Sequence, residues 1–197
     1  CPECDMELQP RMGGFCPACG LLYAFTEADP YLCAHCRKVC PPWDGFGFLN
    51  AYAGVLRDII LDFKFHARFE LGHVLRSLLQ RAHAYHFQGL CPDCIVPVPL
   101  HARRLRERGF NQSLEISRGL SRVLAAPLQP CALERKRWTR AQSGLERKER
   151  QENVRGAFQA ADEHVQGKHV LLVDDVSTTG ATLKACTHAL RRAGAGR

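Results

Sequence analysis

The chain has 197 residues, 46% of them hydrophobic and 24% charged, so it can bury one sizeable core and is not intrinsically disordered. It contains no run of about 18 apolar residues and no basic-then-apolar leader, so we expect no membrane insertion and a cytoplasmic location. The net charge of +7 is uneven: residues 1–50 carry 3 basic and 6 acidic side chains, and residues 51–197 carry 24 and 14. This excess favours polyanionic ligands such as pyrophosphate or a nucleic-acid backbone.

Cysteines dominate the N-terminal segment, where seven of the eleven fall within the first 40 residues, mostly as Cys-x-x-Cys turns. Too few apolar residues surround them to hold a core unaided. Such paired turns supply thiolates to a tetrahedral zinc ion, and the bound metal supplies folding free energy. We therefore expect a structural Zn²⁺ ribbon over residues 1–44 rather than a disulfide framework, because no leader to an oxidising compartment is visible.

The pairing of these turns is open between two ligand sets. The sets are Cys1, Cys4, Cys16 and Cys19, or Cys16, Cys19, Cys33 and Cys36. We favour the second, because the chain starts on a cysteine and a missing preceding segment would then carry the partner of Cys1 and Cys4. Cys40 is expected to be a bystander. The later pair, Cys91 and Cys94, is either an extra metal half-site or two ordinary loop cysteines.

After residue 44 the composition changes, which predicts a second domain over residues 45–197. Two helices are predicted at its start, a short one with inward-facing apolar residues from 56 to 63 and a longer one from 71 to 82. The longer helix has an apolar stripe at the spacing of a core-facing helix. Its members are Leu71, Val74, Leu75, Leu78, Leu79 and Ala82.

A strand is predicted over residues 95–99, and its alternating prolines indicate that it ends by leaving regular pairing. Four arginines in six positions follow it, and guanidinium groups can clamp a pyrophosphate through parallel hydrogen bonds. They are Arg103, Arg104, Arg106 and Arg108. The alternative is a solvated basic turn before the helix predicted over residues 116–124.

Residues 134–155 hold eight basic and four acidic side chains with little core pattern, so a mobile loop is expected. Together with the basic turn, this loop predicts weak, sequence-tolerant binding of single-stranded DNA, since arginines contact phosphates and aromatic rings stack on bases. The candidate residues are Arg106, Arg108, Phe110, Arg137, Trp138 and Arg140. The alternative is that this charge serves only pyrophosphate and solubility.

The apolar run 170–173 predicts a strand buried on both faces, as in a parallel sheet flanked by helices. Asp174 and Asp175 follow it, and as acceptors they suit the two hydroxyls of a vicinal diol. A small-residue loop then leads into a helix whose N-terminus suits a phosphate. The residues expected to bind this phosphate, from the loop and the start of the helix, are Ser177, Thr178, Thr179, Gly180, Ala181 and Thr182. A diol beside a phosphate describes ribose 5-phosphate.

This order of strand, double acid and Thr-Thr-Gly loop resembles the signature of the type I phosphoribosyltransferases, which bind phosphoribosyl pyrophosphate (PRPP) there. The resemblance implies an α/β fold with a mainly parallel sheet flanked by helices, and Mg²⁺ bound together with PRPP. It also implies a pyrophosphate loop at Pro99, Leu100 and His101. The catalytic residues would be Arg103, Arg104, Asp174 and Asp175.

The run of motifs along the whole chain resembles the ComF family of phosphoribosyltransferase-like proteins. The shared motifs are the Cys-x-x-Cys turns, Tyr52-x-Gly54, Lys64-Phe65, Val96 to His101, Arg108 to Gln112, Thr139-x-x-Gln142, Asn153-Val154 and the PRPP loop. Departures are Ser177, where the family has an aliphatic residue, the Cys91/Cys94 pair and a missing Cys-x-x-Cys turn.

The ComF resemblance implies a role in DNA uptake during natural transformation, with single-stranded DNA handled beside a helicase-like partner protein. Two other functions stay open, a catalytic phosphoribosyltransferase of unknown acceptor and a non-catalytic zinc-ribbon scaffold. We also expect the sequence to be truncated at both ends, because residues 194–197 stop where an α/β unit should enter its next strand.

Overall fold

The computed structural model separates the chain into two units, residues 1–90 and 91–197, and describes residues 2–26, 28–66, 68–139 and 147–196. The first unit extends past the change of composition and includes α4 (Leu71–His86), which is hydrogen-bonded to residues 1–50. Tyr85 Oη donates to Met12 O at 3.2 Å, and His86 Nε2 lies 2.8 Å from Phe48 O. The domain boundary near residue 45 stays a prediction.

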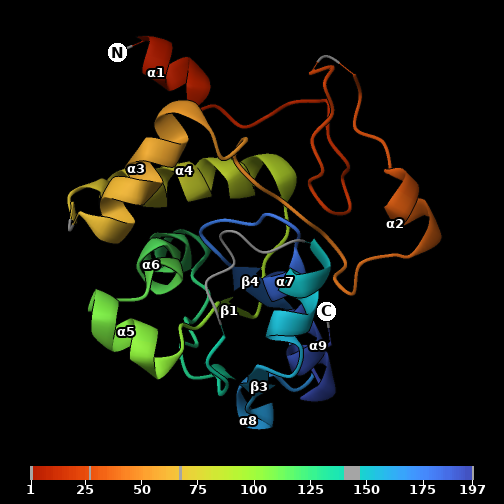
Figure 1. Cartoon of the computed structure of the whole chain (residues 1–197), viewed down its shortest axis with the longest axis vertical. Helices are drawn as coiled ribbons and strands as arrows, with labels where there is room; N and C mark the ends of the chain where they lie inside the picture. The colour runs from red at the N-terminus through yellow and green to blue at the C-terminus, as the bar shows by residue number, and fades with distance from the viewer. Residues whose placement is uncertain (1, 27, 67, 140–146, 197) are drawn as a thin grey trace. The chain divides into compact units, whose positions relative to one another are not determined.

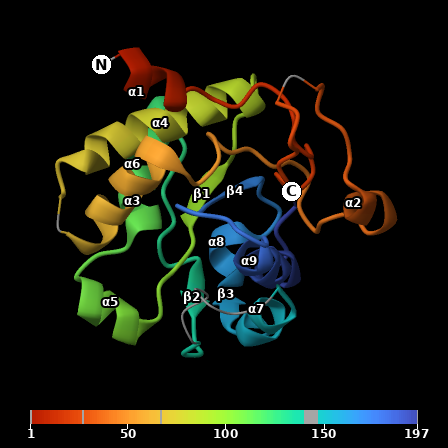
Figure 2. The same ribbon diagram turned by 45° about the horizontal axis from the view of Figure 1, so that its top comes forward.

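Helices α3 (Gly54–Phe65) and α4 lie side by side in the first unit (Figures 1 and 2), after two short helices, α1 (Pro2–Glu7) and α2 (Ala34–Lys38). Their buried side chains recur every three or four residues, which places them on one face of each helix. These side chains are Leu56, Ile60 and Phe63 of α3 and Leu75, Leu78 and Ala82 of α4. Both predicted helices are confirmed, and α4 ends four residues later than expected.

The centre of the second unit is a parallel pair of strands, β1 (Cys94–Pro97) and β4 (Val170–Val173), with Cys94 opposite Val170 and Pro97 opposite Val173. On the other side of β1, Ile95 forms a parallel bridge to Leu128. All four residues of β1 are buried, whereas in β4 only Val173 is. The expectation that β4 is buried on both faces is therefore wrong, and β1 is the strand that has this burial.

An antiparallel hairpin of β2 (Leu133–Arg135) and β3 (Phe158–Ala160) forms the second sheet. Helix α7 (Arg147–Val154) lies between these strands in sequence, and α8 (Asp162–Val165) follows them. The prediction of a loop throughout 134–155 is thus wrong at both ends, because β2 buries Leu133 and Arg135 on one face and α7 is helical. Residues 140–146 lie outside the described part of the chain.

Three further helices complete the second unit: α5 (Ala102–Arg108), α6 (Gln112–Leu124) and α9 (Ala181–Arg192). Helix α6 packs against β1 and β4, while α9 packs against β2 and β3 (Figure 2). The apolar faces follow the helical period, with Ile116 and Leu120 buried on α6 and Leu183 and Leu190 buried on α9. The α/β fold with parallel strands flanked by helices, expected from the sequence, is confirmed. Within the described ranges, no helix has the length and apolarity needed to cross a membrane.

Candidate functional site

The loop that follows β4 joins two acids to a helix N-terminus. Asp174 and Asp175 come directly after Val173 and are half-buried, whereas Ser177 and Thr178 are exposed. Gly180 is the N-cap residue of α9 with φ 70° and ψ 5°, a left-handed conformation that favours glycine. The first helical residue of α9, Ala181, therefore lies eight residues after the last residue of β4, and the orphan backbone N–H groups of the first turn face the end of this loop.

The first acid is oriented by α6. The hydroxyl of Ser113, a buried residue, donates to Asp174 Oδ1 at 3.0 Å, and the backbone N–H of Asp175 donates to the same oxygen at 3.0 Å. Ser113 is itself held by Asn111, whose Oδ1 accepts the Ser113 N–H at 3.1 Å and whose Nδ2 donates to Val98 O at 3.1 Å. The acid and the segment after β1 are thus tied to the same turn of α6.

The predicted pyrophosphate loop lies at the same edge as the acids, because β1 and β4 are parallel and end opposite each other at Pro97 and Val173. Pro99 is buried, and Leu100 and His101 are half-buried. His101 caps α5, since its Nδ1 accepts the backbone N–H of Arg103 at 3.2 Å. The two strand ends therefore bring together segments that are 76 residues apart in the sequence.

The arginines of α5 differ in their environment. Arg103 and Arg106 are exposed, and Arg103 Nε donates to Glu107 Oε1 at 2.9 Å. Arg108 is half-buried: burial lowers the pKa of its guanidinium, and the nearby Asp175 carboxylate partly offsets this effect. The basic turn thus has two half-buried arginines, Arg104 and Arg108, and two that are open to solvent. Arg108 is near enough to feel the charge of Asp175 at the acid-bearing edge, the end of β1 and β4 that carries the two acids.

The residues predicted to contact DNA differ in their exposure and in their hydrogen bonds. Trp138 is 37% exposed, and Phe110 is half-buried. The Arg137 guanidinium donates hydrogen bonds within the protein, to Asn153 O at 2.9 Å and to Arg155 O at 2.7 Å. Arg140 lies outside the described residues.

Four cysteine sulfurs meet in the first unit, all within 4.8 Å of one another. They belong to Cys16, Cys19, Cys33 and Cys36, which is the second of the two predicted sets. The Cys19 and Cys33 sulfurs are 3.9 Å apart, close to the edge of about 3.8 Å expected for a tetrahedron with metal–sulfur bonds of about 2.3 Å. Cys4 is not in this group, and Cys1 lies outside the described residues.

The pKa values of the thiols in this cluster indicate that it is suited to a cation. Burial raises the pKa of the Cys16 thiol, but hydrogen bonds from the backbone of Cys33, Ala18 and Cys19 outweigh it and lower the value to about 7. Burial and the neighbouring sulfurs raise the pKa of the Cys36 thiol far above its usual range. Four thiolates this close can form together only around a positive ion, so the cluster is suited to bind metal.

Known proteins resemble the chain over most of its length. The model of the phosphoribosyl transferase domain matches residues 111–197. DNA utilization protein YhgH of Escherichia coli (strain K12) is 38% identical over 183 residues, covering 91% of this chain and 79% of that protein. Competence protein F of Haemophilus influenzae is 32% identical over 213 residues, covering 98% and 91%, and competence protein ComFC of Bacillus subtilis is 27% identical over 209 residues, covering 98% and 78%. The chain belongs to the ComF family.

In this ComF-family chain, the sequence motifs did not identify two residues near the acid-bearing edge, Ser113 and Arg135. Ser113 directly follows the Phe110-Asn111-Gln112 motif, and its position in the first turn of a helix capped by Asn111 is the signal that could have found it. Arg135 was counted with the solvated basic loop but is 8% exposed in β2. Its Nη2 donates to the buried Thr139 hydroxyl, and its Cζ lies 5.3 Å from the Phe158 ring centroid.

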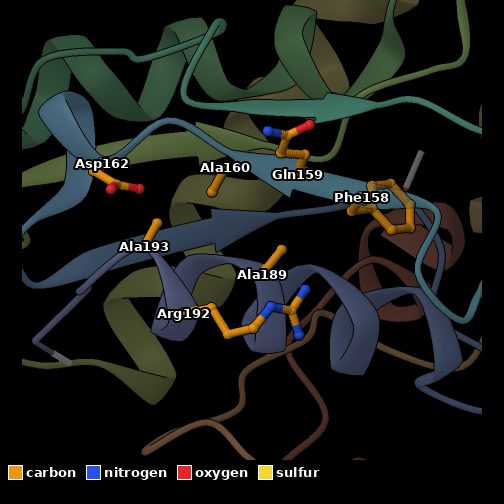
Figure 3. A pocket seen from close by; sticks show the side chains of 7 residues that line it. All are labelled: Phe158, Gln159, Ala160, Asp162, Ala189, Arg192 and Ala193. Atoms are coloured by element: carbon orange, nitrogen blue, oxygen red, sulfur yellow. The ribbon is translucent and has the colours of Figure 1, made fainter.

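A separate hollow of about 170 Å³ lies between β3 and the C-terminal end of α9 (Figure 3). Asp162 and Arg192 are its charged lining residues, and the others are Phe158, Gln159, Ala160, Ala189 and Ala193. It is smaller than the roughly 300–1,000 Å³ typical of small-molecule sites. It also lies at the opposite end of α9 from Gly180, so in this ComF-family chain the acid-bearing edge remains the candidate site.

Proposed function

We propose that this ComF-family protein binds PRPP at the edge formed by the ends of β1 and β4, and that it acts in the use or uptake of DNA. The observation that carries the PRPP site is the position of Asp174 and Asp175, between the end of β4 and the N-terminus of α9. The acids suit the ribose hydroxyls, and residues 177–182 suit the 5-phosphate. The arginines of α5, on the parallel-strand edge beside them, suit the pyrophosphate.

The donor set at this edge fits Mg²⁺, because carboxylate oxygens are the ligands that this ion prefers and Asp174 is oriented by Ser113 and the Asp175 N–H. Asp174 and Asp175 would hold the ion together with oxygens of PRPP. Bound there, it would neutralise pyrophosphate charge and assist departure of pyrophosphate from the ribose. Arg103 and Arg104 would orient that leaving group.

The names of the relatives, a DNA utilization protein and two competence proteins, support the proposed role in the use or uptake of DNA. The basic residues that the chain exposes beside the candidate site support the same role, since they suit a single-stranded phosphate backbone. A helicase-like partner and a cytoplasmic location belong to this proposal. Zn²⁺ is the ion we propose for the four-cysteine cluster, because four thiolates in tetrahedral spacing form a structural zinc site.

Calorimetric titration with PRPP and Mg²⁺, run beside an assay for pyrophosphate release, tests the proposal. The double variant Asp174→Ala with Asp175→Ala should lose detectable PRPP binding, since each acid contributes a charge-assisted bond worth roughly 1.5–3 kcal/mol. Asp162→Ala with Glu163→Ala is the matched control, because it removes an adjacent pair of acids from α8. Equal affinity in the first double variant and the unmodified protein would exclude the diol assignment.

Pyrophosphate release separates the enzymatic alternative from a binding role. Release that depends on an added nucleophile would indicate a catalytic phosphoribosyltransferase. PRPP binding without release would indicate that PRPP is a regulatory ligand. If the protein binds neither PRPP nor DNA, the zinc-ribbon scaffold is the function that remains.

A further inference from the structure

The Trp138 indole is surrounded by the residues that begin α5. The Cζ atom of Arg103 lies 4.9 Å from the indole centroid and that of Arg104 lies 5.4 Å from it. The His101 ring meets the indole edge to face, with centroids 5.3 Å apart and planes at 68°. Trp138 follows β2, so a residue from a separate part of the chain contacts the turn proposed to bind pyrophosphate.

These contacts constrain the guanidinium groups without consuming their hydrogen-bond donors. A guanidinium held over an aromatic ring uses its flat face, whereas its N–H donors lie in the plane and point outward from the edges. Adjacent arginines repel each other, and the negative face of an indole offsets that repulsion. Trp138 can therefore hold two cations close together while leaving N–H edges directed at an anion.

The same turn also has hydrogen bonds within α5 and its cap. His101 Nδ1 accepts the Arg103 N–H at 3.2 Å, and Glu107 Oε1 accepts from Arg103 Nε at 2.9 Å. The first turn of α5 is thus held in part by its own residues, and Trp138 adds contacts from a separate part of the chain. Removing the indole should take away the aromatic contact of both guanidinium groups, while Arg103 keeps its bond to Glu107 and the backbone of this turn stays in place.

We propose that Trp138 is a positioning residue of the pyrophosphate half of the site, which holds the guanidinium planes of Arg103 and Arg104 so that their N–H edges meet the oxygens of a diphosphate. This inference rests on the proposed PRPP function. It assigns Trp138 to one half of the ligand only, because the ribose 5-phosphate half is built from the loop after β4.

Two probes separate the halves: inorganic pyrophosphate with Mg²⁺, and ribose 5-phosphate. Trp138→Leu should weaken pyrophosphate binding on the order of tenfold, because two cation–π contacts are lost, and should leave ribose 5-phosphate binding within about twofold. Trp138→Phe should restore most of the pyrophosphate affinity, since it keeps an aromatic face. Retained ribose 5-phosphate binding also verifies that each variant is folded.

Tryptophan fluorescence tests the positioning role directly, because a purely structural role of Trp138 predicts no change of emission when pyrophosphate binds. The chain has two tryptophans, so in Trp43→Phe the emission excited at the red edge of the spectrum comes from Trp138. Pyrophosphate should then change the emission, because its binding alters the two cations on the indole, whereas ribose 5-phosphate should not. Trp43→Phe by itself should leave both affinities unchanged.

Three results would overturn the inference. Equal loss of affinity for both probes in Trp138→Leu would indicate a general structural role. Undiminished pyrophosphate binding in that variant would show that the arginines need no positioning. Binding of neither probe by the unmodified protein would reject the proposed function and this inference with it.

Discussion

The Ser113 hydroxyl donates to Asp174 Oδ1 at 3.0 Å and so connects the first turn of α6 to the carboxylate that directly follows β4. The donor is buried, so water does not compete for the hydroxyl. A hydrogen bond to a charged acceptor in such a place contributes roughly 1.5–3 kcal/mol. We therefore treat the orientation of Asp174 as a property of α6 as much as of its own loop.

Ser113→Ala should weaken PRPP binding on the order of tenfold, equivalent to about 1.4 kcal/mol, because Asp174 loses the donor that orients it. Calorimetric titration measures the change. Ser121→Ala is the matched control on the same helix, since its hydroxyl donates to Ala126 O at 2.7 Å and makes no bond to the acids. A similar loss of affinity in both variants would assign the effect to helix stability.

Metal content tests the four-cysteine cluster. Freshly prepared, reduced protein should contain about one zinc per chain by elemental analysis, and Cys36→Ser should lose most of it because one of four thiolates is removed. Chelation should lower the unfolding temperature, since the bound ion supplies folding free energy. Cys40→Ser, at an exposed cysteine four residues further on, should keep the metal. Protein without metal would contradict the assignment.

Acid should destabilise the first unit through His83. Burial lowers the pKa of this imidazole below its ordinary value of 6.5. Above pH 6.5 the imidazole is neutral in both folded and unfolded chains, and no stability is lost. As the pH falls below 6.5 the unfolded chain takes up a proton that the folded chain resists, so the free energy of unfolding decreases.

His83→Leu should reduce this loss of stability below about pH 6.5, measured by urea unfolding at several pH values. Part of the loss will remain, because burial also lowers the pKa of His86. His73→Gln is the control, since His73 is exposed on the same helix. An identical pH dependence in His83→Leu and the unmodified protein would rule out this residue.

Single-stranded DNA should bind weakly, without base preference and with a steep dependence on salt. Each neutralised phosphate contributes roughly −0.7 to the log–log slope, so Arg103→Ala with Arg104→Ala should flatten it by about 1.4. Fluorescence anisotropy of a labelled oligonucleotide measures the slope. PRPP should weaken the binding, because both ligands would use these arginines.

An adjacent pair of arginines at the other end of α9 supplies the control for the DNA experiment. Arg191→Ala with Arg192→Ala removes the same charge away from the candidate site and should change the slope less. Equal flattening in the two double variants would indicate that only net charge matters. Absence of binding even at low salt would discard the DNA surface.

The strongest local patterns predicted the structure well. The apolar run 170–173, the helical stripe of 71–82 and the turn at Gly180 each depend on residues close in sequence, and the structure has an element at each place. The gathering of Cys33 and Cys36 with Cys16 and Cys19 was predicted, because each turn supplies half of a tetrahedron.

The long-range contacts of Arg135 and Trp138 were not predicted. Arg135 appeared solvated because a charged residue in a basic run usually is, yet the alternation of β2 places it on the buried face beside Phe158. The packing of Trp138 on Arg103 and Arg104 joins segments more than thirty residues apart, and no local pattern encodes such a pair.

The pairing of β1 with β4 determines which fragment of this protein can be expressed. In the part of the chain that the structure describes, β1 is the strand that pairs with β4, and it ends at residue 97. The match to the transferase domain begins at residue 111. A fragment cut there would leave one edge of β4 without its hydrogen-bond partners, and such an edge promotes aggregation. A fragment that begins at residue 91 retains both strands and is the one to purify.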